Sequence, residues 1–409
     1  MQGFSQKVNS WTGSQLRLWE GSPALFPTFL RPFSVTEQTV KEREVEDAIQ
    51  SALRRKAEFR TLSEDDKASL KSRIRGAIVR QLSTAGEPGN KKFLEECERT
   101  AEDFVREAHE FDPALSDDDV HQALRNQWVF NSFQQLLGTP LTLTPSSFAY
   151  SLLYPYTDNI LDRNHRGTTE VVEFLDWITS RLGGELLPSR DPQTIPVGRL
   201  IAKVENEFSR SQFPDVFGGL LAIHTAQQKS LTLLSPIEPI PWSTVLDISF
   251  EKGGTSVLAD GYLIRGVMSE EQASGSFAYG VALQLIDDLQ DIKEDMAAHH
   301  SSMFTLEAMV RPLDSMTNQL LHYVHSSVVP LLSRLHGDAP RFAALIEQSC
   351  VYLILEAVAR NGSFYSPGYL VRIEPFMPLR MAYLADAREK VAKKLPLPEV
   401  FDRKEARVA

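Results

Sequence analysis

The chain is poor in cysteine and in long apolar runs, and it has fewer basic residues (43) than acidic ones (54). Its two cysteines, Cys97 and Cys350, give no disulfide framework and no zinc-ligand spacing, which predicts a reducing, cytoplasmic setting. No stretch approaches 18 uninterrupted apolar residues, so we expect no transmembrane helix, and the N-terminus lacks the pattern of a signal peptide. The formal net charge of −11 argues against a nucleic-acid partner but permits a local basic pocket for an anionic ligand.

Strand patterns are also nearly absent, because apolar residues recur at helical spacing almost throughout. We therefore predict an all-α fold. The expected organisation is an aromatic strap and helical cap over residues 1–90, a helical domain over 91–395 and a tail over 396–409. Helices are predicted at 37–60, 63–84, 90–110, 116–137, 146–163, 169–183, 196–211, 213–232, 240–251, 255–266, 270–297, 311–335, 338–361 and 375–394.

One acidic run has a structural explanation. Ser116 is followed by three aspartates, and this pattern is typical of a helix N-terminus, where Asp and Ser side chains cap free N–H groups. We predict a capping role for this run and no metal site.

The segment 280–295 carries a second kind of acidic pattern. Gln284, Asp287, Asp288 and Asp291 lie three or four residues apart, so they share one stripe of a helix whose neighbouring residues are apolar. Carboxylates crowded on a buried face repel one another, and burial raises the cost of each unpaired charge. A divalent cation would relieve both costs, whereas a solvated acidic face on a surface helix is the alternative.

Two further features complete a candidate site. Asp158 and Asp162 form an i,i+4 pair on the helix predicted at 146–163. Lys252 precedes Gly253-Gly254, and we interpret this Gly-Gly pair as a helix break whose free N–H groups could bind an anion. Together, two carboxylate-bearing helices and a lysine fit a magnesium–diphosphate site, because Mg²⁺ prefers carboxylate and phosphate oxygens.

The stretch from Leu283 to Asp291 resembles the second aspartate-rich motif, F-Q-x-x-D-D-x-x-D, of trans-isoprenyl diphosphate synthases, with Leu283 in the place of Phe. Lys252 is similar to the lysine with which those enzymes hold diphosphate. The segment Asp158–Asp162 resembles the first motif, D-D-x-x-D, with Asn159 replacing one aspartate. The likeness covers about residues 145–300, and the helical pattern agrees with it to about 390.

Departures from the elongating synthases favour a different branch of this superfamily. The altered first motif is similar to that of bacterial class IB terpene synthases, and no G-K-x-x-R segment for isopentenyl diphosphate is found. The resemblance implies a helical bundle around a central cavity and a Mg²⁺-dependent lyase that cyclises an all-trans prenyl diphosphate. Chain elongation with isopentenyl diphosphate is the alternative, and a non-catalytic prenyl-diphosphate-binding subunit is a third hypothesis.

The resemblance also implies residue roles and partners. Two or three Mg²⁺ ions would be held by five aspartates: Asp158, Asp162, Asp287, Asp288 and Asp291. The diphosphate would be bound by Lys252, Gln284, Arg166 and Arg163. The cavity aromatics would be Tyr154, Tyr156, Phe148 and Phe277, through cation–π stabilisation or through ordinary core packing. A homodimer is the oligomeric state that the family suggests.

Overall fold

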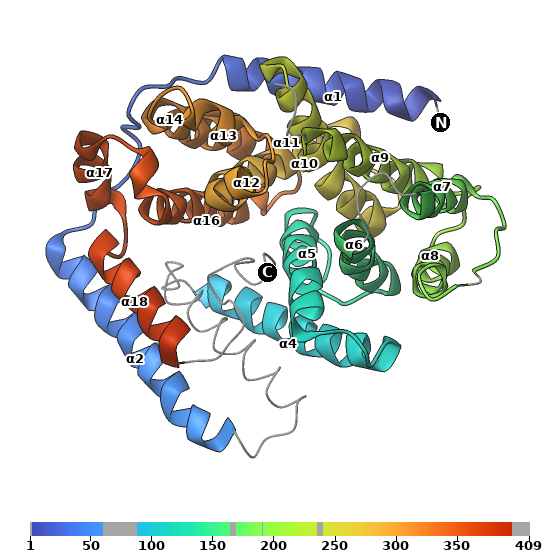
Figure 1. The fold of residues 1–409 in the computed structure, drawn as a ribbon, viewed down its shortest axis with the longest axis horizontal. Coiled ribbons are helices and arrows are strands. Elements are labelled where there is room, and N and C mark those ends of the chain that lie inside the picture. The colour runs from blue at the N-terminus through green and yellow to red at the C-terminus, as the bar shows by residue number, and fades with distance from the viewer. Residues whose placement is uncertain (1, 60–87, 164–168, 190, 235–239, 395–409) are drawn as a thin grey trace.

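The computed structural model describes residues 2–59, 88–163, 169–189, 191–234 and 240–394. Within these ranges the chain is helical, and its one β-type pairing is a single bridge between Leu234 and His300. The predicted all-α fold is confirmed. Figure 1 shows the central helices packed side by side; they are α5 (Asp117–Leu136), α6 (Pro145–Arg163), α7 (Thr169–Gly183), α8 (Thr194–Glu207), α9 (Pro214–Ser230), α10 (Trp242–Arg265), α11 (Glu270–Gln290) and α16 (Ala339–Arg360).

Helices α10 and α11 cross in close backbone contact, and this crossing corrects one prediction. Gly253 and Gly254 do not break a helix, since α10 runs through them without interruption. A methyl carbon added at Gly280 would lie 2.1 Å from the carbonyl oxygen of Gly253, and one added at Gly254 would lie 2.2 Å from the Phe277 ring. The glycines are therefore needed for close approach of two helices, a role that the sequence pattern does not distinguish from a break.

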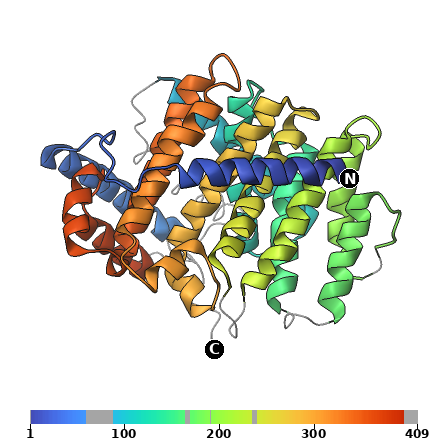
Figure 2. The ribbon, with the colours of Figure 1, turned by 90° about the horizontal axis from the view of Figure 1, so that it is seen from above.

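The N-terminal segment is ordered and helical. Helix α1 (Gln2–Glu20) lies across the bundle, as Figure 2 shows, and contacts α9, α10, α11 and α14. Its apolar face inserts Trp11 and Trp19, which pack against Phe277 and Phe250 respectively. The predicted strap is thus a helix that covers the α10–α11 pair.

A second N-terminal helix lies apart from α1 in the described part of the chain. Helix α2 (Val35–Phe59) pairs with α18 (Met381–Lys394), as Figure 1 shows, and Glu42 accepts a 2.8 Å hydrogen bond from Nε of Arg380. The helix predicted at 63–84 lies outside the described residues. The remaining elements are α4 (Pro88–Phe111), η1 (Leu231–Leu233), α12 (Ile292–Ala297), α13 (Met303–Ala308), α14 (Asp314–Tyr323), η2 (Val324–Val328), α15 (Val329–Leu332), η3 (Gly362–Phe364), α17 (Pro367–Ile373) and η4 (Glu374–Phe376).

Two helix ends test the local predictions. Ser116 caps α5, and its side chain and that of Asp119 bond to each other's backbone N–H, so the predicted capping role is confirmed. The single helix predicted at 270–297 is wrong at Asp291, where α11 ends and α12 begins.

Among the described helices, α16 is long and apolar enough to cross a membrane by length and composition, a test that buried core helices also pass. It packs against α11, α14 and α15.

Candidate functional site

The last turns of α11 present the acidic stripe that the sequence singled out. Nε2 of Gln284 donates a 2.7 Å hydrogen bond to Oδ1 of Asp288. Asp288 is buried, and its second oxygen, Oδ2, has no hydrogen-bond partner among the described residues. An unpartnered buried carboxylate oxygen costs free energy of folding, so we expect this atom to bind a ligand.

Burial and mutual repulsion change the protonation of these carboxyls. Burial raises the pKa of Asp288 to about 7, and the charge of Asp295 adds to this rise. Burial raises the pKa of Asp291 to about 9, with further contributions from Asp287 and Asp295. Because a positive charge beside them would favour their ionised forms, the stripe is electrostatically suited to bind cations.

One cation of the protein already contacts this stripe. Nη2 of Arg125, on α5, lies 3.1 Å from Oδ1 of Asp287 and bridges α5 to α11. The positive charge of Arg125 also opposes the rise in the pKa of Asp291. Sequence reasoning missed Arg125, because it belongs to no motif and lies 162 residues before its partner.

The C-terminal end of α11 is held by the C-terminal end of α16. The buried side chain of Asn361 donates hydrogen bonds to the carbonyl oxygens of Leu289 (2.9 Å) and Gln290 (3.3 Å). These carbonyls are among those that a helix end leaves without intrahelical partners. Asn361 therefore fixes the helix end that carries Asp287, Asp288 and Asp291.

Lys252 lies on α10 beside the crossing with α11. The anion site predicted from free N–H groups after Gly254 is wrong, because α10 is continuous there and the Thr255 hydroxyl donates to the carbonyl of Glu251. The residue after Lys252, Gly253, packs directly on Gln284 of α11. Any anion would therefore meet the lysine side chain and not a helix N-terminus.

A second polar group lies two turns further along α10. Asp260 is fully buried and accepts a 3.3 Å hydrogen bond from the Asn126 amide, which also lies 3.1 Å from the hydroxyl of Ser151. Burial raises the pKa of Asp260 well above its usual range. Lys252 and Asp260 share one stripe of α10 at i,i+8, and this stripe faces α5 at Asp260.

Helix α6 carries the other predicted pair. The backbones of Asp158, Asp162 and Arg163 belong to α6, but their side chains lie outside the described part of the structure, and Arg166 lies outside it altogether. Pro155 is within this helix, and the Thr157 hydroxyl donates to the carbonyls of Leu153 and Tyr154. Both features are typical of a helix that bends.

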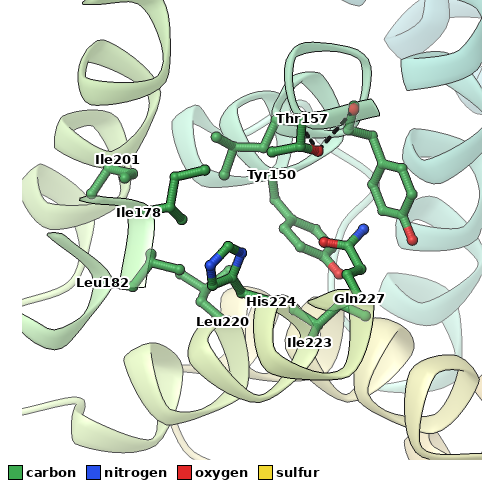
Figure 3. Close-up of a pocket in the computed structure, with 11 residues that line it drawn as sticks. Tyr150, Thr157, Ile178, Leu182, Ile201, Leu220, Ile223, His224 and Gln227 are labelled. Carbon is green, nitrogen blue, oxygen red and sulfur yellow. Dashed lines mark hydrogen bonds between the residues drawn. The ribbon is translucent and has the colours of Figure 1, made fainter. Parts of the chain in front are cut away.

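An apolar cavity lies between α6, α7, α8 and α9, and Figure 3 shows its lining. Its volume is about 40 Å³, which is room for about three water molecules. The one titratable nitrogen group in the lining is His224, whose pKa is lowered by burial and whose Nε2 lies 3.1 Å from the Leu175 carbonyl. The lining consists of Tyr150, Leu153, Tyr154, Thr157, Ile178, Leu182, Ile201, Leu220, Ile223, His224 and Gln227.

The structure places the four predicted cavity aromatics in different surroundings. Tyr154 lines the cavity, together with Tyr150, which the sequence did not single out. Phe148 packs on Phe104 and Phe111 in the core, and Phe277 packs on Trp11 of α1. Tyr156 donates its hydroxyl to Asp112 Oδ2 at 2.6 Å. The last three do not line this cavity.

The described residues contain no group of three or more His, Cys, Asp or Glu side chains placed to hold a metal ion by themselves. Mg²⁺ does not require such a group, because it keeps several waters and takes one or two carboxylates plus substrate phosphates. The orphaned Oδ2 of Asp288 and the neighbouring carboxylates supply donors of this kind. The acidic end of α11 therefore fits Mg²⁺ together with a phosphate ligand.

Comparisons with known proteins return no relative. No protein-family model, no curated protein and no solved structure matches this chain.

Proposed function

We propose that the protein is a Mg²⁺-dependent terpene synthase that ionises a linear prenyl diphosphate, cyclises the allylic cation and releases diphosphate. The observation that carries this proposal is the buried Asp288 carboxylate with an unpartnered oxygen, set among Asp287 and Asp291 and next to a cation from α5. Such a stripe suits a divalent cation better than it suits the stability of the fold.

Each part of the site has a role in this proposal. Asp287, Asp288 and Asp291 would hold Mg²⁺ from α11, and Asp158 and Asp162 would hold it from α6. When bound, Mg²⁺ supplies positive charge that stabilises diphosphate as a leaving group. Lys252 and Gln284 contact the diphosphate oxygens, with Arg163 and Arg166 as further donors.

The apolar cavity has the chemistry of a site for hydrocarbon. Leucine and isoleucine side chains from four helices line it, while the Tyr150 and Tyr154 rings offer π faces to a positive charge. Tyr154 lies four residues before Asp158 on α6, so the same helix carries a cavity wall and a proposed metal ligand.

Chain elongation with isopentenyl diphosphate is the second candidate. If the protein elongates chains, Tyr154 in the cavity lining would favour short products, because a bulky ring there would limit the length of a growing chain. A single experiment separates the two activities. The protein is incubated with Mg²⁺ and geranyl, farnesyl, geranylgeranyl or longer diphosphates, with and without isopentenyl diphosphate.

Cyclisation predicts a hydrocarbon or alcohol product and free diphosphate without isopentenyl diphosphate. If a longer diphosphate forms, and forms only when isopentenyl diphosphate is present, the protein is a chain-elongating synthase and not a cyclase. We expect Asp288→Asn and Asp158→Asn to lower turnover by roughly 100-fold, because each removes a ligand charge. The matched control is Asp386→Asn on the exposed face of α18, which should keep full activity. If both site variants stay active, the metal assignment is wrong.

A further inference from the structure

Arg125 is the cation that the structure places against the acidic stripe. Its Nη2 lies 3.1 Å from Asp287 Oδ1, and the two side chains are 39% and 34% exposed. Ion pairs with this degree of exposure contribute only about 0.2–1 kcal/mol, so a competing cation can displace Arg125 at little cost. The contact is therefore an exchangeable one, whereas the partly buried hydrogen bond between Gln284 and Asp288 lies within one helix.

The guanidinium of Arg125 can donate further hydrogen bonds beyond its contact with Asp287. It carries five N–H donors in a fixed fork, and among the described residues its one hydrogen bond, from Nη2, goes to Asp287. The preceding and following turns of α5 are fixed by packing, and the next residue, Asn126, is held by Ser151 and Asp260. The α5 backbone thus presents the free side of the fork beside the acidic end of α11.

We infer that Arg125 is an additional binding residue of this site, which holds Asp287 in the metal-free protein and turns to the diphosphate when Mg²⁺ takes Asp287. This inference rests on the proposed function. A planar guanidinium suits phosphate oxygens as well as a carboxylate, so one side chain can serve both states without a change of backbone.

The inference predicts effects of opposite sign in two calorimetric titrations of the full chain. With MgCl₂ alone, Arg125→Gln should bind Mg²⁺ about 2- to 5-fold more tightly than wild type, because a competing cation is gone. With inorganic pyrophosphate in saturating Mg²⁺, the same variant should bind about 10-fold more weakly, because a charged hydrogen bond is lost. Arg125→Lys, which keeps the charge but not the fork, should fall between wild type and Arg125→Gln in pyrophosphate affinity.

Controls distinguish failure of the inference about Arg125 from failure of the proposed function. Arg106→Gln removes an exposed arginine from an Arg–Asp pair on α4 and should leave both titrations unchanged. If wild type binds Mg²⁺ and pyrophosphate, and Asp288→Asn weakens both, the site stands. If Arg125→Gln then shifts neither affinity, or shifts both in one direction, the inference about Arg125 is overturned. If wild type binds neither probe, the proposed site fails and the inference fails with it.

Discussion

The Asp260 carboxyl lies between α5 and α10. It accepts one hydrogen bond, from Asn126, and has no ion-pair partner among the described residues. Burial raises its pKa well above the usual range, so the folded protein holds a proton there that the unfolded chain releases. Stability from this group is present below the unfolded pKa of about 3.9 and is lost as pH rises towards the folded pKa.

Asp260→Asn should therefore stabilise the protein at neutral pH. The amide copies the shape of the protonated carboxyl and never ionises, so we expect a gain of about 1–3 kcal/mol at pH 7.5 that shrinks towards pH 4.5. Urea unfolding at the two pH values measures the difference, with Asp386→Asn as an exposed control that should change little. A gain that is equal at both pH values would show that Asp260 is not protonated in the fold.

Arg125 and Asn361 illustrate what sequence reasoning could not find at the residue scale. The acidic stripe and Lys252 belong to recognisable spacings, so they were singled out from the sequence. Arg125 and Asn361 reach α11 from helices distant in sequence, and each is an ordinary residue in its own segment. Only the packing of α5 and α16 against the bundle brings them to the end of α11.

The crossing of α10 and α11 determines how the site is built at the scale of elements. Gly253 and Gly280 touch through their backbones, and a side chain on either residue would force the helices apart. We expect Gly280→Ala to cost about 1–3 kcal/mol, because an overpacked contact can relax only by moving a helix. Chemical denaturation measures this loss.

The matched control is a glycine in a helix with ordinary space around it. At Gly13 of α1, the nearest atom to an added methyl carbon would be Nη1 of Arg17, at 3.6 Å. Gly13→Ala should stabilise the protein by up to about 1 kcal/mol, since alanine is the better helix former. If the two substitutions have the same effect, close approach of α10 and α11 is not the reason for Gly280.

The predicted helices agree with the structure where periodicity and caps act together, as at Ser116 and along α7, whose bounds match the prediction at 169–183. The errors occur where one local signal has two physical explanations. The Gly253-Gly254 pair is consistent with a helix break and equally with a close helix contact. At Asp291, where α11 ends, the sequence has no glycine or proline that would predict the break. Such choices depend on the neighbouring helix and not on the segment itself.

At the scale of the whole molecule, α1 behaves as part of the core. Trp19 is 3% exposed and packs edge-on against Phe250 and Tyr323, whereas the preceding residue, Leu18, is 36% exposed. Trp19→Ala should cost about 3–5 kcal/mol because it opens a cavity between α1, α10 and α14. Leu18→Ala should cost far less, and thermal unfolding compares the two. Equal losses would mean that α1 is not docked through Trp19.

The overall class followed from the sequence, because helical periodicity and scarce strand signals leave few architectures open. The cavity between α6 and α9 did not, since its walls come from four helices whose apolar residues look like any core positions. Phe148 and Phe277 show the same ambiguity, as their rings serve packing in the core. Which apolar residues border a space is a property of the assembled bundle.

The position of Asn361 in the sequence determines when the acidic end of α11 can be completed during synthesis of the chain. It lies 72 residues after Leu289, whose carbonyl it caps. A growing chain on the ribosome therefore contains all of α11, with each of its acidic residues, long before it contains the residue that fixes the end of that helix. Assembly of the acidic end of α11 is consequently a late event, completed only after α16 has been synthesised and has docked.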